Sequence, residues 1–149
     1  MKWLLIIMLF IIGGCSSVTE IKERGDRWPN ANPNFCITSW GTIYVPNGKL
    51  AEYTGDKISV QNAALLEHEE MHAARQRACL YAFWHMSYAT SKEFRWKEEQ
   101  LGYKVQIEYL RAHGIKPTED WFIGLVMDDF YGGMVSKEDA SKWFRSLPN

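Results

Sequence analysis

Three residues in the middle of the chain have the types and spacing needed for metal chemistry. They are His68, Glu69 and His72, in the pattern His-Glu-x-x-His. On a helix, a spacing of four residues puts both imidazoles on one face, one turn apart, where they can bind the same metal ion. Glu69 lies about 100° around the helix from His68 and can reach a water on an open metal position. The pattern is typical of a zinc hydrolase, in which imidazoles hold the ion and a carboxylate takes a proton from water.

The same residues could instead belong to the solvated face of a helix, with Glu67, Glu69 and Glu70 as ordinary surface charges. Two other features of the sequence favour the metal site. One is a signal for export to a metal-accessible compartment. The other is a set of carboxylates on a second predicted helix.

A catalytic zinc site takes three protein ligands, so the two histidines need a third partner. No histidine follows within ten residues of His72. The strongest candidates lie in residues 96–103, which read Trp-Lys-Glu-Glu-Gln-Leu-Gly-Tyr. The candidates for the third ligand, in order of preference, are Glu99, Glu98, and then His85 or Glu93. One of the adjacent pair Glu98 and Glu99 is expected to be a plain surface charge.

Together the two segments resemble the gluzincin metallopeptidases, the thermolysin-like group. In that family a first helix carries His-Glu-x-x-His, and a second helix supplies a glutamate ligand, often within Glu-x-x-Ala followed by Asp or Tyr. Residues 99–103, Glu-Gln-Leu-Gly-Tyr, fit this form with Gly102 in place of alanine. The resemblance spans about residues 41 to 110. It implies that Glu99 is the third zinc ligand, and that the strand at 42–45 forms the upper rim of a substrate cleft.

Hydrolysis of a peptide bond also needs a donor for the developing oxyanion. Tyr103 lies four residues after Glu99, on the same face of the predicted helix, and is our catalytic candidate. An aromatic residue at this spacing can equally belong to the core. Tyr88 is a further candidate. His85 fits a half-buried structural histidine, and His113 fits the end of its helix, where a cation is favoured.

The N-terminal residues are typical of an export signal. Lys2 is followed by an apolar run at 3–12 and then by Gly-Gly-Cys at 13–15. The apolar run and the two glycines would rise about 18 Å as a helix, short of the roughly 30 Å hydrocarbon core of a bilayer. Residues 12–15 resemble the bacterial lipoprotein signal, which implies a lipidated Cys15 at the outer membrane, facing the periplasm. The sequence also leaves open a retained membrane anchor or soluble secretion.

The remaining sequence is that of one small domain. A length of 149 residues and a net charge of −1 fit a single globular unit without the basic surface that nucleic acid would require. We predict a signal peptide at 1–14, a tether at 15–34 and a single metallopeptidase-like domain at 35–149. The tether is polar and is expected to have little structure of its own.

Apolar periodicity and turn signals predict an α+β fold, a helix-dominated, minimal zincin-like core with a small antiparallel sheet before the first helix. One or two strands are expected within 35–45. Helices are expected at 59–82, 91–112 and 119–130, with a short one after Ser136. Capping residues expected at three of the helix starts are Ser59, Thr90 with Glu93, and Ser136 with Asp139.

Three cysteines are too few for a disulfide scaffold. If Cys15 is lipidated, Cys36 and Cys79 remain as an even pair in an oxidising compartment. We therefore predict a disulfide between them, although two buried free thiols would also fit the sequence.

These features predict a zinc-dependent metallopeptidase anchored at the cell envelope and acting on a peptide or protein substrate. A hydrolase of peptidoglycan peptide bonds would use the same chemistry. From a different class, a non-catalytic lipoprotein could keep the metal for structure or bind a partner.

Overall fold

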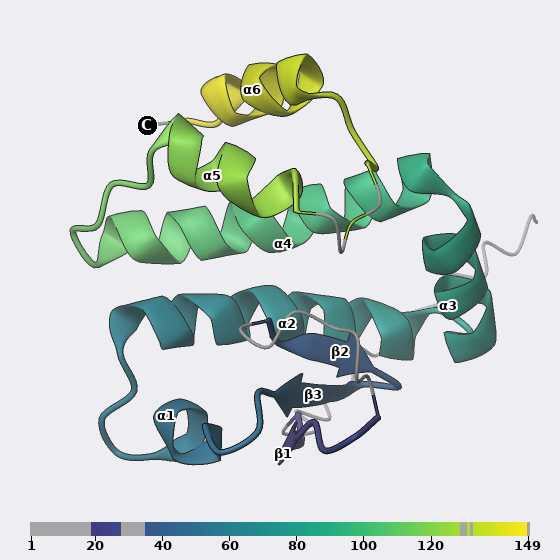
Figure 1. Ribbon diagram of the computed structural model, residues 1–149, viewed down its shortest axis with the longest axis vertical. Coiled ribbons are helices and arrows are strands. Elements are labelled where there is room, and N and C mark those ends of the chain that lie inside the picture. Colours follow the sequence, from purple (N-terminus) through teal and green to yellow (C-terminus); the bar gives the residue numbers. More distant parts are fainter. Residues whose placement is uncertain (1–18, 28–34, 129–130, 132, 149) are drawn as a thin grey trace, which may run out of the picture.

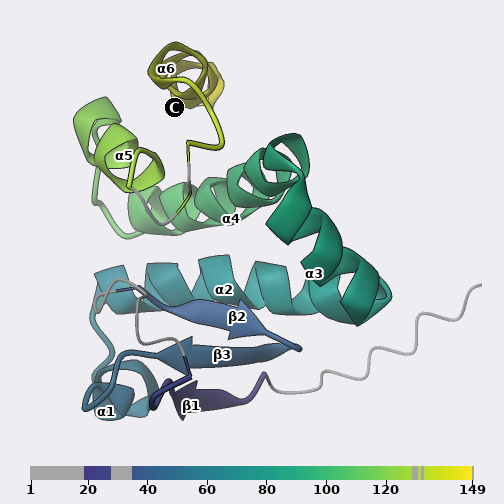
Figure 2. The same cartoon turned by 45° about the vertical axis from the view of Figure 1, so that its right-hand side comes forward.

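The computed structural model describes residues 19–27, 35–128, 131 and 133–148. The small sheet lies against one side of a long central helix, a second long helix packs on its other side, and two C-terminal helices cover the second (Figures 1 and 2). The elements in chain order are β1 (Ile21–Glu23), β2 (Ile37–Ser39), β3 (Thr42–Val45), α1 (Leu50–Thr54), α2 (Val60–Ala78), α3 (Tyr81–Thr90), α4 (Lys92–Ala112), α5 (Glu119–Val126) and α6 (Lys137–Ser146). The predicted α+β, helix-dominated class is confirmed.

Hydroxyl side chains determine where the longer helices begin. Those of Ser59, Ser91, Thr118 and Ser136 each accept a hydrogen bond from the backbone N–H three residues further on. Each bond satisfies one of the free donors at a helix start. The predictions for Ser59 and Ser136 are confirmed. The predicted cap at Thr90 is wrong, since this residue ends α3 and its hydroxyl donates to the Met86 carbonyl.

Three helix predictions need correction. The helix predicted to run to residue 82 ends at Ala78, because Cys79 has an extended backbone conformation, and α3 then begins as a separate helix. The helix predicted to reach residue 130 ends at Val126. The short helix α1 was not predicted.

The sheet has the order β1-β3-β2 and is mixed. β2 pairs antiparallel with β3, while β1 pairs parallel with it, so the predicted purely antiparallel sheet is wrong. β1 also lies within the predicted tether, which therefore contributes to the fold. β3 is the central strand. The strand that lies closest to α2 near the candidate site is β2, so the expectation that residues 42–45 form the rim needs correction.

Two apolar clusters lie on either side of the α2–α4 contact. One joins the sheet, α1 and α2, and includes Ile43, Val45 and Leu66. The other joins α4, α5 and α6, and includes Ile107 and Phe122. Between them lies a layer of buried polar side chains: His68, Glu69, His72, Gln76, Glu98, Glu99 and Gln106. Burying such groups is costly unless they find partners.

Candidate metal centre

The two histidines and one glutamate converge in this polar layer. The Nε2 atoms of His68 and His72 lie 3.0 Å apart. Oε2 of Glu99 lies 3.4 Å from Nε2 of His68, and Oε1 of Glu99 lies 3.4 Å from Nε2 of His72. Donor atoms bound to zinc at 2.0–2.1 Å in a tetrahedron are about 3.3 Å apart. These residues therefore form a cluster that could hold a metal ion.

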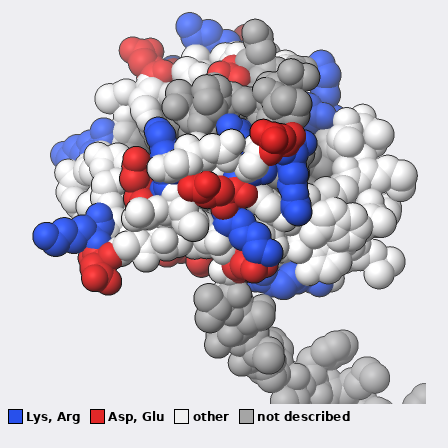
Figure 3. Space-filling model, turned by 60° about the horizontal axis from the view of Figure 1, so that its bottom comes forward, with Lys and Arg blue, Asp and Glu red and all other residues white. Residues whose placement is uncertain are grey.

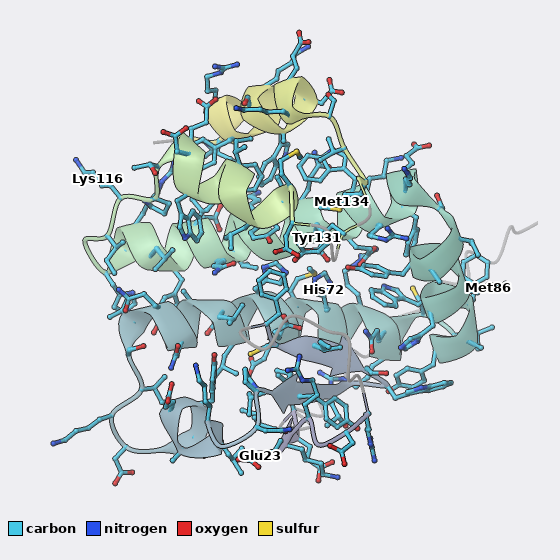
Figure 4. All side chains as sticks on the ribbon, viewed as in Figure 1. Glu23, His72, Met86, Lys116, Tyr131 and Met134 are labelled. Carbon is cyan, nitrogen blue, oxygen red and sulfur yellow. The ribbon has the colours of Figure 1, made fainter. Side chains whose placement is uncertain are left out.

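The cluster is made by the packing of two helices. His68 and His72 lie one turn apart on α2, as the spacing predicts, and Glu99 comes from α4 opposite them. Figure 4 shows His72 between these two helices, near the middle of the molecule. All three side chains are buried, which shields the cluster from bulk water.

Two neighbouring side chains fix the orientation of the cluster. Nδ1 of His68 lies 3.0 Å from Oε1 of Gln106, so the amide oxygen accepts the Nδ1 hydrogen and leaves the Nε2 lone pair for a metal. The Tyr88 hydroxyl donates to Oε1 of Glu99 at 2.5 Å. Within the described residues, Oε2 of Glu99 and Nδ1 of His72 have no hydrogen-bond partner. A buried carboxylate oxygen with no hydrogen-bond partner, 3.4 Å from an imidazole nitrogen, fits a metal site.

Gln106 was not predicted as a site residue, and Tyr88 was predicted only as a further candidate for the oxyanion donor, not as a partner of Glu99. Gln106 lies seven residues after Glu99, two turns along the same face of α4, and this spacing was the signal that could have identified it. Tyr88 lies on α3, whose position depends on tertiary packing, so no local pattern predicts its hydrogen bond to Glu99.

The charges in the cluster stabilise one another. Burial acts to raise the pKa of Glu99, but His72 and His68 outweigh it and lower that pKa well below its usual range. Burial acts to lower the pKa of His72, but Glu99 outweighs it and the pKa rises. Burial, reinforced by the charge of Glu99, raises the pKa of Tyr88 well above its usual value. Tyr88 therefore stays protonated and donates to an ionised Glu99.

Glu69 lies beside the cluster on α2 and is buried. The Thr38 hydroxyl, on β2, donates to Oε2 of Glu69 at 2.6 Å. Gln76 holds β2 in place, since its amide donates to the Thr38 carbonyl and accepts from the Gly41 N–H. The edge strand thus positions the carboxylate that the motif assigns to proton transfer.

Glu98, the second candidate for the third ligand, has a different environment. Arg75 donates to both of its carboxylate oxygens at 2.6–2.9 Å, and the Trp84 indole donates to Oε2 at 3.1 Å. Glu98 is 1% exposed and Glu99 2% exposed. The expectation that one of them is a surface charge is therefore wrong, because α3 covers this part of α4 and both carboxylates find partners.

His85 and Glu93, the remaining candidates for the third ligand, do not join the group of His68, His72 and Glu99, although His85 lines the smaller cavity beside it. His85 bonds to the Tyr81 carbonyl and stacks on Trp40, which fits the predicted structural role. Glu93 is exposed and pairs with Lys97. The position of His113 at the end of α4 agrees with its predicted place in the helix.

Tyr103 lies against the cluster but is part of the core. Its ring meets the His68 ring edge-on, with centroids 4.7 Å apart, and its hydroxyl lies 3.0 Å from that of Tyr131. Burial raises the pKa of Tyr103 well above its usual value, so the hydroxyl remains a donor. Its proposed action on an oxyanion remains a prediction.

Two cavities meet at the candidate site. The larger, of about 640 Å³, runs between the N-terminal half of α2 and the C-terminal half of α4. The smaller, of about 180 Å³, is lined by the three cluster residues and by β2. His68 and Glu69 line both cavities, so a ligand in either one would lie against them.

The predicted disulfide is wrong, because Cys36 and Cys79 are free cysteines. Cys36 is buried in the cluster that contains Leu66. Cys79 ends the helix that carries Leu66, about 20 Å further along its axis, far beyond the reach of a disulfide. The predicted signal peptide and the lipidation site Cys15 lie outside the described residues. Within the part of the chain that is described, no helix is long and apolar enough to cross a membrane.

Comparisons with protein-family models, with curated proteins and with solved structures give no match to this chain.

Proposed function

We propose that this chain is a zinc-dependent metallopeptidase of the gluzincin type, which hydrolyses peptide bonds. The observation that carries the proposal is the convergence of three buried donors, from His68, His72 and Glu99, beside Glu69 on the wall of a cleft. Neither a solvated helix face nor an apolar core would need this arrangement.

Each of these side chains has a distinct role in the proposed reaction. His68 and His72 would hold the ion through Nε2, and Glu99 would hold it through a carboxylate oxygen. When bound, zinc would supply a Lewis acid that makes water more acidic and polarises a carbonyl group. The Glu69 carboxylate accepts the proton of the attacking water and passes it to the leaving amine. Thr38 and Gln106 keep Glu69 and His68 in the required orientations.

The number of ligands supports a catalytic site rather than a structural one. Structural zinc sites are closed by four protein ligands, whereas catalytic sites keep one position open. Among the described residues, no fourth His, Cys, Asp or Glu joins the group formed by His68, His72 and Glu99. Cys79, which could have closed the site, is at the far end of α2 and exposed.

We further propose that the protein is anchored in the cell envelope through a lipid on Cys15. The signal in residues 1–15 supports this location. The substrate is then a peptide, a protein or a peptide cross-link of the envelope. The size of the larger cavity is compatible with side chains of an extended peptide.

The test is an unbiased cleavage assay with the full chain in detergent, loaded with zinc, on peptide libraries and cross-linked peptidoglycan peptides. Glu69→Gln should retain zinc but lose activity by at least about 10²–10⁴-fold, because the amide cannot accept a proton. Glu70→Gln is the matched control, since Glu70 is exposed and next in sequence, and it should retain activity. Full activity in Glu69→Gln, or no cleavage by the wild type, would contradict the proposal.

A further inference from the structure

One end of the molecule has an apolar surface that nothing in the described fold covers. It consists of four large side chains, Trp40 (61% exposed), Leu80 (83%), Phe83 (59%) and Met86 (60%), which we call the α3 apolar surface. No Asp, Glu, Lys or Arg occurs between Arg77 and Lys92. In Figure 3 the right-hand end of the molecule, where α3 lies in Figure 1, is largely free of charged side chains. Exposed apolar groups gathered in this way mark an interaction site.

Trp40 extends this surface from the sheet onto α3. It lies in the two-residue turn between β2 and β3, where both Trp40 and Gly41 have positive φ angles, 52° and 74°. Such turns favour asparagine and glycine, and a bulky residue there is strained. The indole stacks on His85 at 5.1 Å and lies 5.4 Å from the Tyr81 ring. The backbone strain at Trp40, together with the exposure of its indole beside α3, indicates a role for this side chain.

The chain enters the described fold at this same end. The Thr19 hydroxyl accepts a hydrogen bond from Arg77, and Arg77 also donates to the carbonyl of Gly41, next to Trp40. Cys15 precedes Thr19 by four residues, which span at most about 14 Å. A lipid on Cys15 would therefore lie close to the α3 apolar surface.

We propose that the α3 apolar surface inserts into the interface of the bilayer that holds the lipid on Cys15. The inference rests on the proposed anchor, but not on the peptidase activity. Tryptophan, phenylalanine and leucine are the side chains that enter a membrane interface most readily. The short link to Cys15 keeps the surface at a high effective concentration near the bilayer, so even weak insertion would be populated.

Insertion would orient the catalytic cleft. Figure 4 shows Met86 and Lys116 at opposite ends of the molecule. Lys116 lines the larger cavity, so that end of the cleft would face the aqueous side, away from the lipid. A substrate would then reach Glu69 from solution rather than from the bilayer.

The natural thiol of Cys79 provides a probe, because it is exposed next to Leu80, while Cys36 is buried. The full chain is labelled at Cys79 with the environment-sensitive NBD fluorophore. It is then reconstituted in phosphatidylethanolamine–phosphatidylglycerol vesicles. We expect blue-shifted emission and quenching by a headgroup-depth nitroxide lipid. The control chain with Cys79→Ser and Lys116→Cys carries the label at the opposite end and should show neither effect.

A second variant separates the surface from the anchor. Combined Leu80→Ser, Phe83→Ser and Met86→Ser should abolish the shift and the quenching at Cys79, while flotation with vesicles and zinc content stay at the wild-type level. The inference is overturned if the wild-type label at Cys79 behaves like the label at 116, or if the triple variant keeps the shift. A chain that does not float overturns the anchor and this inference together. The peptidase assay in detergent is independent of either result.

Discussion

Gly102 on α4 lies directly against the ring of His68 on α2. A Cβ atom at Gly102 would be 2.5 Å from Nε2 and 2.6 Å from Cδ2 of His68, well inside van der Waals contact. Glycine inside a helix costs about 1 kcal/mol relative to alanine, so its presence here has a local cause. Where the gluzincin pattern has alanine, this chain needs glycine to let α4 approach the metal-binding face of α2.

Gly102→Ala should therefore weaken zinc binding. The new methyl group must displace the His68 ring, whose two nitrogens already contact Gln106 and His72. Zinc affinity, measured by competition with a chelator, should fall while helix content is retained. Gly124→Ala on α5 is the matched control, because a Cβ there meets no atom within 4 Å, and it should leave zinc affinity unchanged. Equal affinity in the two variants would contradict this role of Gly102.

The adjacent glutamates should respond differently to the same substitution. Glu99→Gln should lose bound zinc, because the amide is a poor ligand and the cluster loses its negative charge. Glu98→Gln should keep zinc but unfold more easily, by on the order of 1–3 kcal/mol, because it weakens the bonds from Arg75 and Trp84. Metal analysis and thermal unfolding of both variants test the contrast. Zinc loss in both would contradict the assignment of the third ligand.

Local features of the fold could be predicted from the sequence, because they depend on neighbours along the chain. The imidazoles of His68 and His72 share a face through their spacing, and Ser59 and Ser136 cap helices through their own side chains. Residues 21–23 could not be predicted to form a strand, because a three-residue parallel pairing has no local signal. The same holds for the hydrogen bond from Tyr88 to Glu99, which forms only when α3 packs against α4.

The choice between Glu98 and Glu99 depended on the family resemblance. Residues adjacent on a helix differ by about 100° in direction, so composition cannot say which one faces the histidines. Composition also does not indicate that Glu98 and Glu99 are both buried. Their burial follows from the packing of α3, which carries Trp84, against α4. A small residue at 102 fits close packing of the two helices, but the contact of Gly102 with the His68 ring could not be predicted, since it depends on the distance between α2 and α4.

Gln106→Leu should reduce zinc affinity without changing the ligand set. Leucine is similar in volume but cannot accept the Nδ1 hydrogen of His68, so the ring loses its fixed tautomer and orientation. Loss of such a partner typically costs about 10–100-fold in metal affinity. Chelator competition gives the value directly. An affinity equal to that of the wild type would show that Gln106 does not orient His68.

The two described cysteines should differ in reactivity and remain unbonded. Cys79 should react at once with an alkylating reagent near pH 8, since its thiol is exposed. Burial raises the pKa of Cys36 to about 12, so this thiol should react only after unfolding. The measurement is mass spectrometry of the non-reduced protein, which counts the alkylated cysteines after labelling of the native chain and after labelling of the unfolded chain. A bridged peptide containing Cys36 and Cys79 would contradict the structure.

His68, His72 and Glu99 are proposed to hold one zinc ion and to leave a position open for water. X-ray absorption spectroscopy of the full chain loaded with one equivalent of zinc tests it most directly. We expect two imidazoles and only nitrogen or oxygen ligands at about 2.0–2.1 Å, with one oxygen exchangeable for an added anion. A sulfur ligand at about 2.3 Å, or a shell of four protein ligands with no exchangeable position, would contradict it.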